Sequence, residues 1–390
     1  MKLTATTTFG LEDLLAEELV GIGATNIQKG SHAITFEGDK SVMYRANLEL
    51  RTALRILKPF LEFDINSAED LYKQTYAFDW GNLLSPATTF AITSAVHSDL
   101  FSNSNFISMK AKDAIVDKLR FVFSSRPNID LANPDIRLHL RINMHHCTFS
   151  IDTSGNSLHK RGYRIAQGPA PINEVLAAGM LMLAGWTGET NLIDPMCGSA
   201  TILMEAAAIA KNIAPGILND NFGFMKQRDF NPELWKTLKM EAISRQKEFK
   251  HTIYGFDSSP KAIKLAEENI SGTDLFGSCI KLKTKNISSF TPEYVASIGS
   301  EGVLVLNPPY GERLSRTDIT SLYHDIGDSL KQNFQGYSAW IISGSSAGLK
   351  SIGLRPSQKI KLYNGDIECR YERFDLYSGS KKFKSTEKAD

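Results

Sequence analysis

The sequence predicts an α/β protein in which a parallel sheet, covered by helices on both faces, follows an amino-terminal α+β half. Three observations predict this organisation. After residue 190, short apolar runs alternate with helical segments, which is the pattern of strands buried in a parallel sheet. Near the carboxyl end, Asn364-Gly365 separates two strand-like runs and indicates an antiparallel hairpin. The chain has 390 residues, which is long for a single core, so two or three domains are expected.

The amino-terminal half mixes helices and strands over short distances. Leucines recur at helical spacing between residues 11 and 19, and a second helical pattern runs from 42 to 54. We interpret this half as one or two small α+β domains and not as a repeat array. An amphipathic helix is expected at 106–123, and strands at 33–37, 89–96, 136–142 and 147–151.

The carboxyl-terminal half begins after a breaker at Gly168 to Pro171, and a strongly helical segment follows at 173–186. The next four strands are apolar, and each precedes a helix. We therefore expect a parallel sheet that ends in an antiparallel hairpin. Its strands are expected at 191–193, 252–256, 280–283, 302–306 and 339–342, and those of the hairpin at 359–363 and 368–376.

Composition and charge exclude several classes of protein. Hydrophobic residues make up 42% of the chain and 44 Lys and Arg balance 43 Asp and Glu, which excludes a disordered chain. No run of about 18 apolar residues occurs and the start lacks a signal peptide, so we expect a cytoplasmic protein with no membrane partner. The four cysteines are too widely spread for paired metal ligands, so we expect reduced thiols and no metal site.

The net charge of +1 conceals a basic stretch between residues 110 and 164. This stretch contains ten Lys and Arg residues but only five Asp residues, whereas the chain before residue 110 is acidic. Such a stretch can bind phosphates, or it can simply be a solvated helix face. Lys110 and Lys112 begin this stretch, and Arg161 and Arg164 end it.

The loop from Asp194 to Thr201 is the first candidate site. It follows an expected strand and opens a helix, and ligands of α/β proteins bind at such carboxyl ends of strands. The loop lacks the glycine spacing and the lysine of a phosphate-binding loop. Asp194 can accept a hydrogen bond from an ammonium group and the helix N-terminus favours a carboxylate, so the loop suits a ligand with an amino-acid end. Cys197 has no activating base near it, and we interpret it as a packing residue.

Asp257 is the second candidate. It follows the strand expected at 252–256 and precedes Ser258-Ser259-Pro260, which begin a helix. A carboxylate at this position accepts ribose hydroxyls in dinucleotide-binding folds. The same residue type also caps helices, so a purely capping role stays open.

Asn307-Pro308-Pro309-Tyr310 is the most specific motif of the chain, and it follows the strand expected at 302–306. The two prolines remove backbone donors and fix the path, which leaves the Asn307 side chain and the Pro308 carbonyl free to accept hydrogen bonds. Two acceptors fit the two hydrogens of a planar exocyclic amine, and the Tyr310 ring can stack on a base. Hydrogen bonds that favour a pyramidal nitrogen make its lone pair available for in-line attack on a methyl group.

These motifs resemble those of the bacterial 23S rRNA guanine-N2 methyltransferases, class I enzymes that carry an amino-terminal THUMP domain. The resemblance covers essentially the whole chain. The cofactor loop of the family corresponds to Asp194 through Thr201, its ribose-binding acid to Asp257, and its catalytic Asn-Pro-Pro-Tyr-Gly-Glu-Arg to Asn307 through Arg313. Lys160 through Arg164 resembles the segment that joins the RNA-binding half to the catalytic half.

The resemblance implies a Rossmann-like class I methyltransferase fold and three domains. A ferredoxin-like α/β domain is expected at 1–65, a THUMP RNA-binding domain at 66–165 and a methyltransferase domain at 166–390. The implied cofactor is S-adenosyl-L-methionine, and the implied reaction methylates the exocyclic N2 of a guanine, with 23S rRNA or a pre-ribosomal particle as the expected partner. The implied site residues are Asn307, Pro308 and Tyr310 for catalysis; Asp194, Met196, Cys197, Gly198, Ser199, Thr201, Asp257, Ser258, Asn286, Asn307 and Pro171 for the cofactor; and Lys110, Lys112, Arg161 and Arg164 for RNA.

Departures from the family pattern keep alternatives open. Ala200 replaces the usual glycine, which can crowd the cofactor or change the backbone angles of the loop. Asn286 stands where an acid commonly meets adenine, although an amide oxygen can still accept that bond, and Asn173 replaces a basic residue. The alternatives are a tRNA guanine or another exocyclic amine as substrate, a non-catalytic RNA-binding assembly factor, and a nicotinamide-dependent oxidoreductase, which the missing phosphate-binding glycines disfavour.

Overall fold

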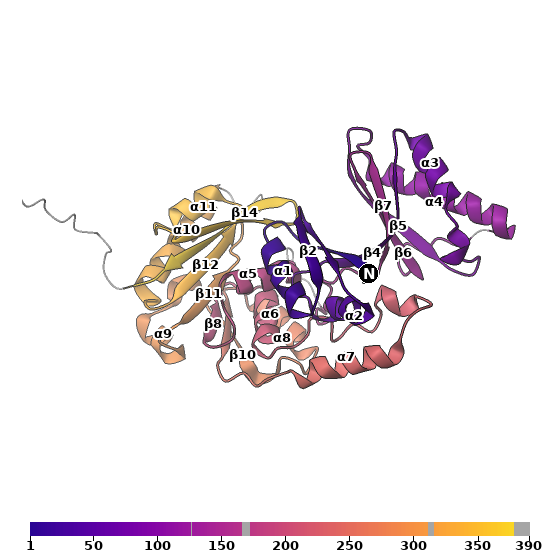
Figure 1. Ribbon diagram of the computed structural model, residues 1–390. Helices are drawn as coiled ribbons and strands as arrows, with labels where there is room; N and C mark the ends of the chain where they lie inside the picture. The colour runs from indigo at the N-terminus through magenta and orange to yellow at the C-terminus, as the bar shows by residue number, and fades with distance from the viewer. Residues whose placement is uncertain (126, 166–171, 311–315, 378–390) are drawn as a thin grey trace, which may run out of the picture. The chain divides into compact units, whose positions relative to one another are not determined.

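The computed structural model describes residues 1–125, 127–165, 172–310 and 316–377 of the chain (Figure 1). The chain divides into two compact units. The amino-terminal unit contains residues 1–162 together with 213–246, and the carboxyl-terminal unit contains 163–212 and the chain from 247 onward. Within the described residues, each unit is built around one seven-stranded sheet.

The sheet of the amino-terminal unit has the order β2-β3-β1-β4-β7-β6-β5. Strand β4 is the longest strand of this sheet, because it pairs with β1 through its first residues and with β7 along most of its length. The sequence did not predict β4, and Pro59 inside it is accommodated by a register shift between Pro59 and Leu61. The strands are β1 (Lys2–Thr6), β2 (Thr25–Gly30), β3 (Ala33–Glu37), β4 (Arg55–Asp64), β5 (Phe90–His97), β6 (Ile136–Asn143) and β7 (His146–Asp152).

The helices of this unit cover two separate cores. Helices α3 and α4 lie against β5, β6 and β7 (Figure 1), where Trp80 is fully buried and donates through Nε1 to the Thr75 carbonyl at 2.7 Å. The helix expected at 106–123 starts two residues earlier, because the Asn103 side chain accepts from the Phe106 backbone and caps it. The helices are α1 (Glu12–Gly21), α2 (Lys40–Glu49), α3 (Ala68–Ala77), α4 (Ser104–Phe123) and α7 (Pro232–Ser244).

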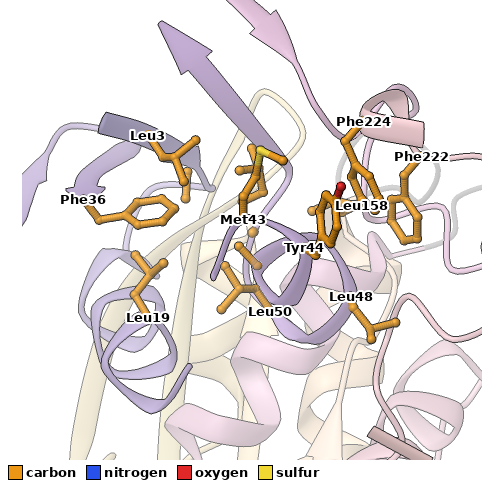
Figure 2. Packing of buried hydrophobic residues seen from close by; sticks show 14 of the residues in the cluster. Leu3, Leu19, Phe36, Met43, Tyr44, Leu48, Leu50, Leu158, Phe222 and Phe224 are labelled. Carbon is orange, nitrogen blue, oxygen red and sulfur yellow. The ribbon is translucent and has the colours of Figure 1, made fainter. Parts of the chain in front are cut away.

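The other core contains a segment that lies far away in the sequence. Figure 2 shows Phe222 and Phe224 beside Tyr44 of α2, and the rings of Tyr44 and Phe224 stack with their centroids 4.4 Å apart. Trp235 and Leu238 of α7 belong to the same buried cluster. Residues 213–246, which interrupt the predicted catalytic domain at 166–390, therefore fold with the amino-terminal unit. The domain boundaries near 65 and 165 stay a prediction.

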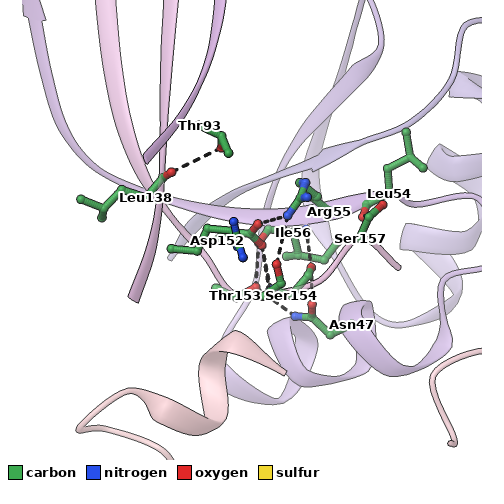
Figure 3. Close-up of polar contacts among 12 residues, drawn as sticks. Asn47, Leu54, Arg55, Ile56, Thr93, Leu138, Asp152, Thr153, Ser154 and Ser157 are labelled. Atoms are coloured by element: carbon green, nitrogen blue, oxygen red, sulfur yellow. Dashed lines mark hydrogen bonds and ion pairs between the residues drawn. The ribbon is translucent and has the colours of Figure 1, made fainter. Parts of the chain in front are cut away.

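A buried polar network ties α2 to strands β4 and β7 (Figure 3). Asn47 donates through Nδ2 to Thr153 Oγ1 at 3.0 Å, and its Oδ1 accepts from Ser154 Oγ at 2.6 Å. The Thr153 and Ser154 hydroxyls also bond the backbone of β4, and Arg55 pairs with Asp152 beside them. Because buried polar groups without partners are costly, these contacts fix the position of α2 on the sheet.

The sheet of the carboxyl-terminal unit confirms the predicted topology. Its order is β10-β9-β8-β11-β12-β14-β13, with β8 to β12 parallel and β14 antiparallel to both of its neighbours. The expected hairpin is present, and its turn is formed by Gly365 and Asp366, because Asn364 still pairs with Ile367; Gly365 has a φ of +60°. The strands are β8 (Asn191–Asp194), β9 (Ile253–Asp257), β10 (Ile280–Thr284), β11 (Gly302–Leu306), β12 (Ser338–Ser343), β13 (Gln358–Asn364) and β14 (Ile367–Asp375).

Local sequence signals set the helix starts in this unit. Asn173 caps α5 by accepting from the Val175 and Leu176 backbones, which gives this residue a structural role. Ser259 caps α8, and Pro260 occupies its first turn. No helix of the described chain is both long and apolar enough to cross a membrane. The helices are α5 (Glu174–Leu183), α6 (Thr201–Ala210), α8 (Pro260–Ser271), α9 (Pro292–Ile298), α10 (Arg316–Asn333) and α11 (Ser346–Ser351).

Candidate active site

Asp194 ends β8 and is almost completely buried, with 1% of its surface exposed. Its Oδ1 accepts from the Met196 backbone at 3.1 Å. Burial raises the pKa of Asp194 to about 8, and the nearby charge of Asp257 adds to the shift. A buried carboxyl group with a raised pKa is stabilised in its ionised form by a cation, so Asp194 fits a ligand that brings an ammonium group.

The loop after Asp194 turns through two left-handed residues. Gly198 has a φ of +54°, and a Cβ built on it meets no atom within 4 Å, so the loop leaves space at this point. Ala200 has a φ of +69° and immediately precedes α6. A glycine adopts this left-handed angle without steric cost. For the alanine, the same angle costs about 1–2 kcal/mol.

Asp257 joins this loop to the next strand. Its Oδ2 accepts from the Gly198 backbone at 3.0 Å, and its Oδ1 accepts from the Ser259 backbone at 2.9 Å. The cap of α8 is Ser259, whose hydroxyl accepts from the Ala262 backbone, so Asp257 is not the capping residue. Each carboxylate oxygen retains a second lone pair that can accept a ribose hydroxyl. Ser258 is exposed beside it.

The remaining loop residues are held by buried contacts. The Cys197 backbone donates to the Phe256 carbonyl at 2.8 Å, and burial raises the pKa of the Cys197 thiol, as expected for a packing residue. Asn269, which the sequence analysis missed, is fully buried on α8. Its Nδ2 donates to the Ser199 carbonyl at 3.2 Å and its Oδ1 accepts from the Ile165 backbone at 3.0 Å. Asn269 therefore holds the loop in position through a buried contact from α8.

Asn286 follows β10 at the carboxyl edge of the sheet, and its side chain is hydrogen-bonded to the neighbouring Ser288. Its Oδ1 accepts from both the backbone and the hydroxyl of Ser288, at 3.0 and 2.9 Å. Both lone pairs of that oxygen are used, so contact with an adenine amine requires these bonds to open. The role of Asn286 stays a prediction, and Pro171 lies outside the described residues.

Asn307 follows β11 and presents an unusual acceptor. Its Oδ1 is buried, and no described residue donates a hydrogen bond to it. Pro308 beside it is buried, and Pro309 is exposed. A buried oxygen without a donor costs about 1–3 kcal/mol, so a ligand that brings an N–H group recovers this cost.

Tyr310 is anchored by the carboxyl-terminal hairpin. Its hydroxyl accepts from Asn364 Nδ2 at 2.8 Å and from the Cys369 thiol at 3.6 Å. Burial is the main cause that raises the pKa of Tyr310. A Cβ on Gly344 would approach the Tyr310 ring to 3.1 Å, so the glycine permits close packing there. The sequence predicted the hairpin but not this contact.

The structure contradicts the prediction that Arg161 and Arg164 bind RNA. The Arg161 side chain is buried and donates to the carbonyls of Leu158 and Arg51. The Arg164 guanidinium forms an ion pair with buried Glu174 at 2.9 Å, and it also donates to the Thr201 hydroxyl. Arg161 is buried and only 10% of the Arg164 side chain is exposed, so both guanidinium groups make their contacts inside the protein, and Arg164 holds the Thr201 hydroxyl.

The other two predicted RNA-binding residues lie on α4 and are paired with acids. Lys110 contacts Glu69 at 2.7 Å and lies over the Tyr72 ring, and Lys112 contacts Asp113 at 2.8 Å. These carboxylates neutralise much of the positive charge that the sequence suggested. A role in RNA binding stays a prediction for Lys110 and Lys112.

Comparison with protein families assigns all three parts of the chain. Residues 2–57 match the RlmL ferredoxin-like domain, residues 66–152 match the THUMP domain, and residues 161–373 match the RMKL-like methyltransferase domain. The last match covers more than half of the chain. These matches confirm the predicted class I methyltransferase fold and the THUMP region.

Individual relatives cover nearly the whole chain. The protein slr0064 of Synechocystis sp., named as a candidate RNA methyltransferase, is 37% identical over 96% of both chains. The ribosomal RNA large subunit methyltransferase K/L of Syntrophotalea carbinolica is 38% identical over 96% of this chain, which spans only 54% of that relative. This chain therefore spans about half the length of the K/L relatives it matches.

A solved structure agrees with this assignment. SMU.472, described as a candidate methyltransferase complexed with SAH, superposes with a TM-score of 0.83 at 30% identity, over 97% of this chain and 99% of its own. The chain belongs to the RMKL-like methyltransferase family.

Proposed function

We propose that this protein transfers a methyl group from S-adenosylmethionine to the exocyclic N2 of a guanine in RNA, and that the RNA is 23S rRNA. The observation that carries the proposal is the buried Asn307 oxygen, to which no residue of the described chain donates. The two prolines next to it supply no backbone donors, so acceptors dominate this turn. Acceptors without donors fit an NH₂ group, and the exocyclic amine of guanine is such a group.

The residues at the carboxyl ends of β8 and β9 fit the cofactor. S-adenosylmethionine supplies, when bound, an electrophilic methyl group on a sulfonium. Asp194 suits its ammonium group, Gly198 leaves room for close approach, and Asp257 has lone pairs for ribose hydroxyls. We propose that the rest of the binding site is formed by Met196, Cys197, Ser199, Thr201, Ser258, Asn286, Asn307 and Pro171.

The catalytic contribution of the chain is to orient the amine. Asn307 Oδ1 and the Pro308 carbonyl accept its two N–H bonds, which favours a pyramidal nitrogen and makes the lone pair available for in-line attack. The Tyr310 ring stacks on the base, which is turned out of its own stack to reach the site. Asn364 and Cys369 hold the Tyr310 hydroxyl and so fix the plane of that ring.

The choice of RNA rests on the amino-terminal unit and the relatives. A THUMP match is present in that unit, and the K/L relatives are named as ribosomal RNA large subunit methyltransferases. The guanine N2 position follows from the resemblance of the Asn307 to Arg313 motif. We propose that the protein acts in the cytoplasm, where bacterial ribosomes are assembled.

Product analysis tests this function. The protein is incubated with methyl-labelled S-adenosylmethionine and with separated rRNA, tRNA and DNA, and the digested nucleosides are identified by mass spectrometry. N2-methylguanosine in the 23S fraction is the expected product. Label in tRNA, or in adenine, would show that the substrate is tRNA or an adenine and not a guanine of 23S rRNA. A protein that binds RNA but neither binds the cofactor nor transfers label would be a non-catalytic assembly factor.

Asn364→Ala tests the anchoring of Tyr310. The substitution removes a hydrogen bond of about 1 kcal/mol, so we expect kcat/KM for RNA to fall about fivefold while cofactor affinity stays unchanged. Tyr310→Phe removes the same bond from the other side, together with the contact from Cys369, so the double variant should lose no more than Tyr310→Phe alone. Asp366→Ala, in the same turn and exposed, is the matched control. Additive losses in the double variant would show that the bond does not link the two residues.

A further inference from the structure

We infer that strand β10 and the residue just after it carry a phosphate-binding track for RNA, formed by Lys281 and Lys283 of the strand and by Lys285, which follows its end at Thr284. The inference rests on the proposed function, because it assigns part of the RNA-binding surface to the catalytic unit itself. The RNA-binding cations predicted from the sequence lie between residues 110 and 164, and none of these three lysines was among them. Four features of β10 carry the inference.

The first feature is the geometry of the strand. Alternate residues of a strand point to the same face, so Lys281 and Lys283 share one face of β10. Lys285 is one residue past the end of the strand, and it lies over the same Tyr294 ring as Lys283. Ile280 and Leu282 point to the other face, beside Glu267 and Asp274 near α8. The rise of the strand separates Lys281 from Lys283 by roughly 6–7 Å, so their ammonium groups can contact different phosphates of one nucleic-acid strand.

The second feature is a row of aromatic rings beneath the lysines. Lys281 Nζ lies 5.9 Å from the centre of the Tyr254 ring, and Lys283 Nζ lies 5.1 Å from that of Tyr294. Lys285 lies over the same Tyr294 ring at 4.4 Å. These contacts hold the long side chains along the rings, so less side-chain entropy is lost when a phosphate binds.

The third feature is the lack of neutralising acids. In the described parts of the chain, none of these lysines has a carboxylate oxygen within 4.0 Å of its ammonium group. By contrast, Lys110 and Lys112 of α4 contact acids at 2.7 and 2.8 Å. Counterion release on phosphate binding depends on uncompensated charge, so β10 gains more from RNA than α4 does.

The fourth feature is the position of β10 in the sheet. It is the edge strand, next to β9, and the Lys285 backbone donates to the Asp257 carbonyl at 2.9 Å. The track therefore ends at the same sheet edge as the cofactor residues. Strand β11, which presents Asn307, lies three strand spacings away, or roughly 14 Å, a distance that a few nucleotides can span.

Lysines on an edge strand have another known role, which is to prevent pairing with strands of other molecules. The two roles differ in what they predict. Protection of the edge requires only a polar, charged strand and is independent of RNA. A phosphate track predicts that each lysine contributes to RNA affinity and to its dependence on salt.

The test replaces the three lysines together, as Lys281→Gln, Lys283→Gln and Lys285→Gln in one variant, and also one at a time. The matched control carries Lys247→Gln, Lys250→Gln and Lys350→Gln, three exposed lysines of the same unit that change the net charge equally. Affinity for a large-subunit rRNA transcript is measured by fluorescence anisotropy at several salt concentrations. Cofactor binding is measured by calorimetry, and aggregation by light scattering.

We expect the β10 triple variant to lose at least about tenfold in RNA affinity, and the slope of log K against log salt to become shallower by about 2, or about 0.7 per lysine. Cofactor affinity should not change, and the control should stay within about twofold of the wild type. An equal loss of RNA affinity in both triple variants, or no loss in either, would overturn the inference. The inference would also be overturned if the β10 triple variant aggregates while the single variants keep the RNA affinity of the wild type. Failure of the wild type to methylate RNA would instead contradict the proposed function.

Discussion

Asn307→Ala is expected to lower kcat for methyl transfer by about a thousandfold or more, while affinity for S-adenosylmethionine changes by less than about threefold. The oxygen removed is the buried acceptor at the end of β11 that no described residue satisfies. If it orients the amine only in the reacting complex, its loss raises the barrier without weakening the binding of the cofactor. Single-turnover assays on RNA and calorimetry with the cofactor measure the two effects separately.

The same substitution has a second, opposite expectation for stability. Removing a buried oxygen that lacks a donor relieves a desolvation cost, so the free energy of unfolding should stay unchanged or rise by about 1 kcal/mol. A residue that merely supports the fold would destabilise it when truncated. Thermal denaturation without ligands therefore distinguishes a site residue from a structural one.

Asn307→Asp is the matched control for the chemistry. A carboxylate still accepts hydrogen bonds, so this variant should retain more turnover than Asn307→Ala, although the added charge at a buried position weakens it relative to the wild type. The order wild type, Asp, Ala is expected for kcat. Normal turnover in Asn307→Ala would contradict the proposed role of this oxygen.

The positions of the main site residues could be predicted because strand ends are local signals. Continuous apolar runs identify parallel strands, and whatever follows them lies at the carboxyl edge of the sheet. Asp194, Asp257 and Asn307 each follow such a run, and the structure brings the first two close enough for the charge of Asp257 to raise the pKa of Asp194. The sequence also predicted the hairpin, because Asn364-Gly365 is a local turn signal, although the turn itself is formed by Gly365 and Asp366.

The errors came from contacts that no local pattern encodes. Arg161 and Arg164 were predicted to bind RNA from a count of charges, but a count does not show that Glu174 and backbone carbonyls lie next to them. Strand β4 was not predicted. Pro59 normally argues against a strand interior, and the register shift that accommodates it depends on the partner strand β7.

The contacts that position the site were missed for the same reason. Asn269 reaches Ser199 across 70 residues, and Asn364 reaches Tyr310 across 54. Residues 213–246 were assigned to the catalytic domain by their place in the sequence, whereas Phe222 and Phe224 pack against α2. Sequence patterns therefore predicted which strands present the chemistry, and long-range packing determined how it is held.

Asp194→Asn is expected to weaken S-adenosylmethionine binding by about a hundredfold or more, equivalent to about 2.7 kcal/mol. The carboxyl group is almost completely buried, and its Oδ1 accepts a hydrogen bond from the Met196 backbone. An ammonium group would pair with its ionised form in a low-dielectric site, and an amide cannot replace that charge. Calorimetry at pH 8 measures the loss, and exposed Asp325→Asn is the control of equal charge change.

The raised pKa of Asp194 gives the wild type a particular pH dependence. With a pKa of about 8 in the free protein, the carboxyl is mostly protonated at pH 6, so binding a cation there requires release of a proton. The affinity should therefore rise with pH up to about pH 8 and then level off, with up to about tenfold per pH unit. Asp194→Asn should show no such rise.

The sign of the effect on stability follows from the same shift. The unfolded carboxyl has a pKa near 4, so between about pH 4 and pH 8 the folded chain binds a proton that the unfolded chain has released. The free energy of unfolding of the ligand-free wild type should therefore fall as the pH rises through this range. Asp194→Asn removes that fall, so at pH 8 it should be more stable by roughly 1–3 kcal/mol while binding cofactor poorly. A variant that is destabilised at pH 8, or that keeps the pH dependence of binding, would show that Asp194 serves the fold and not the cofactor.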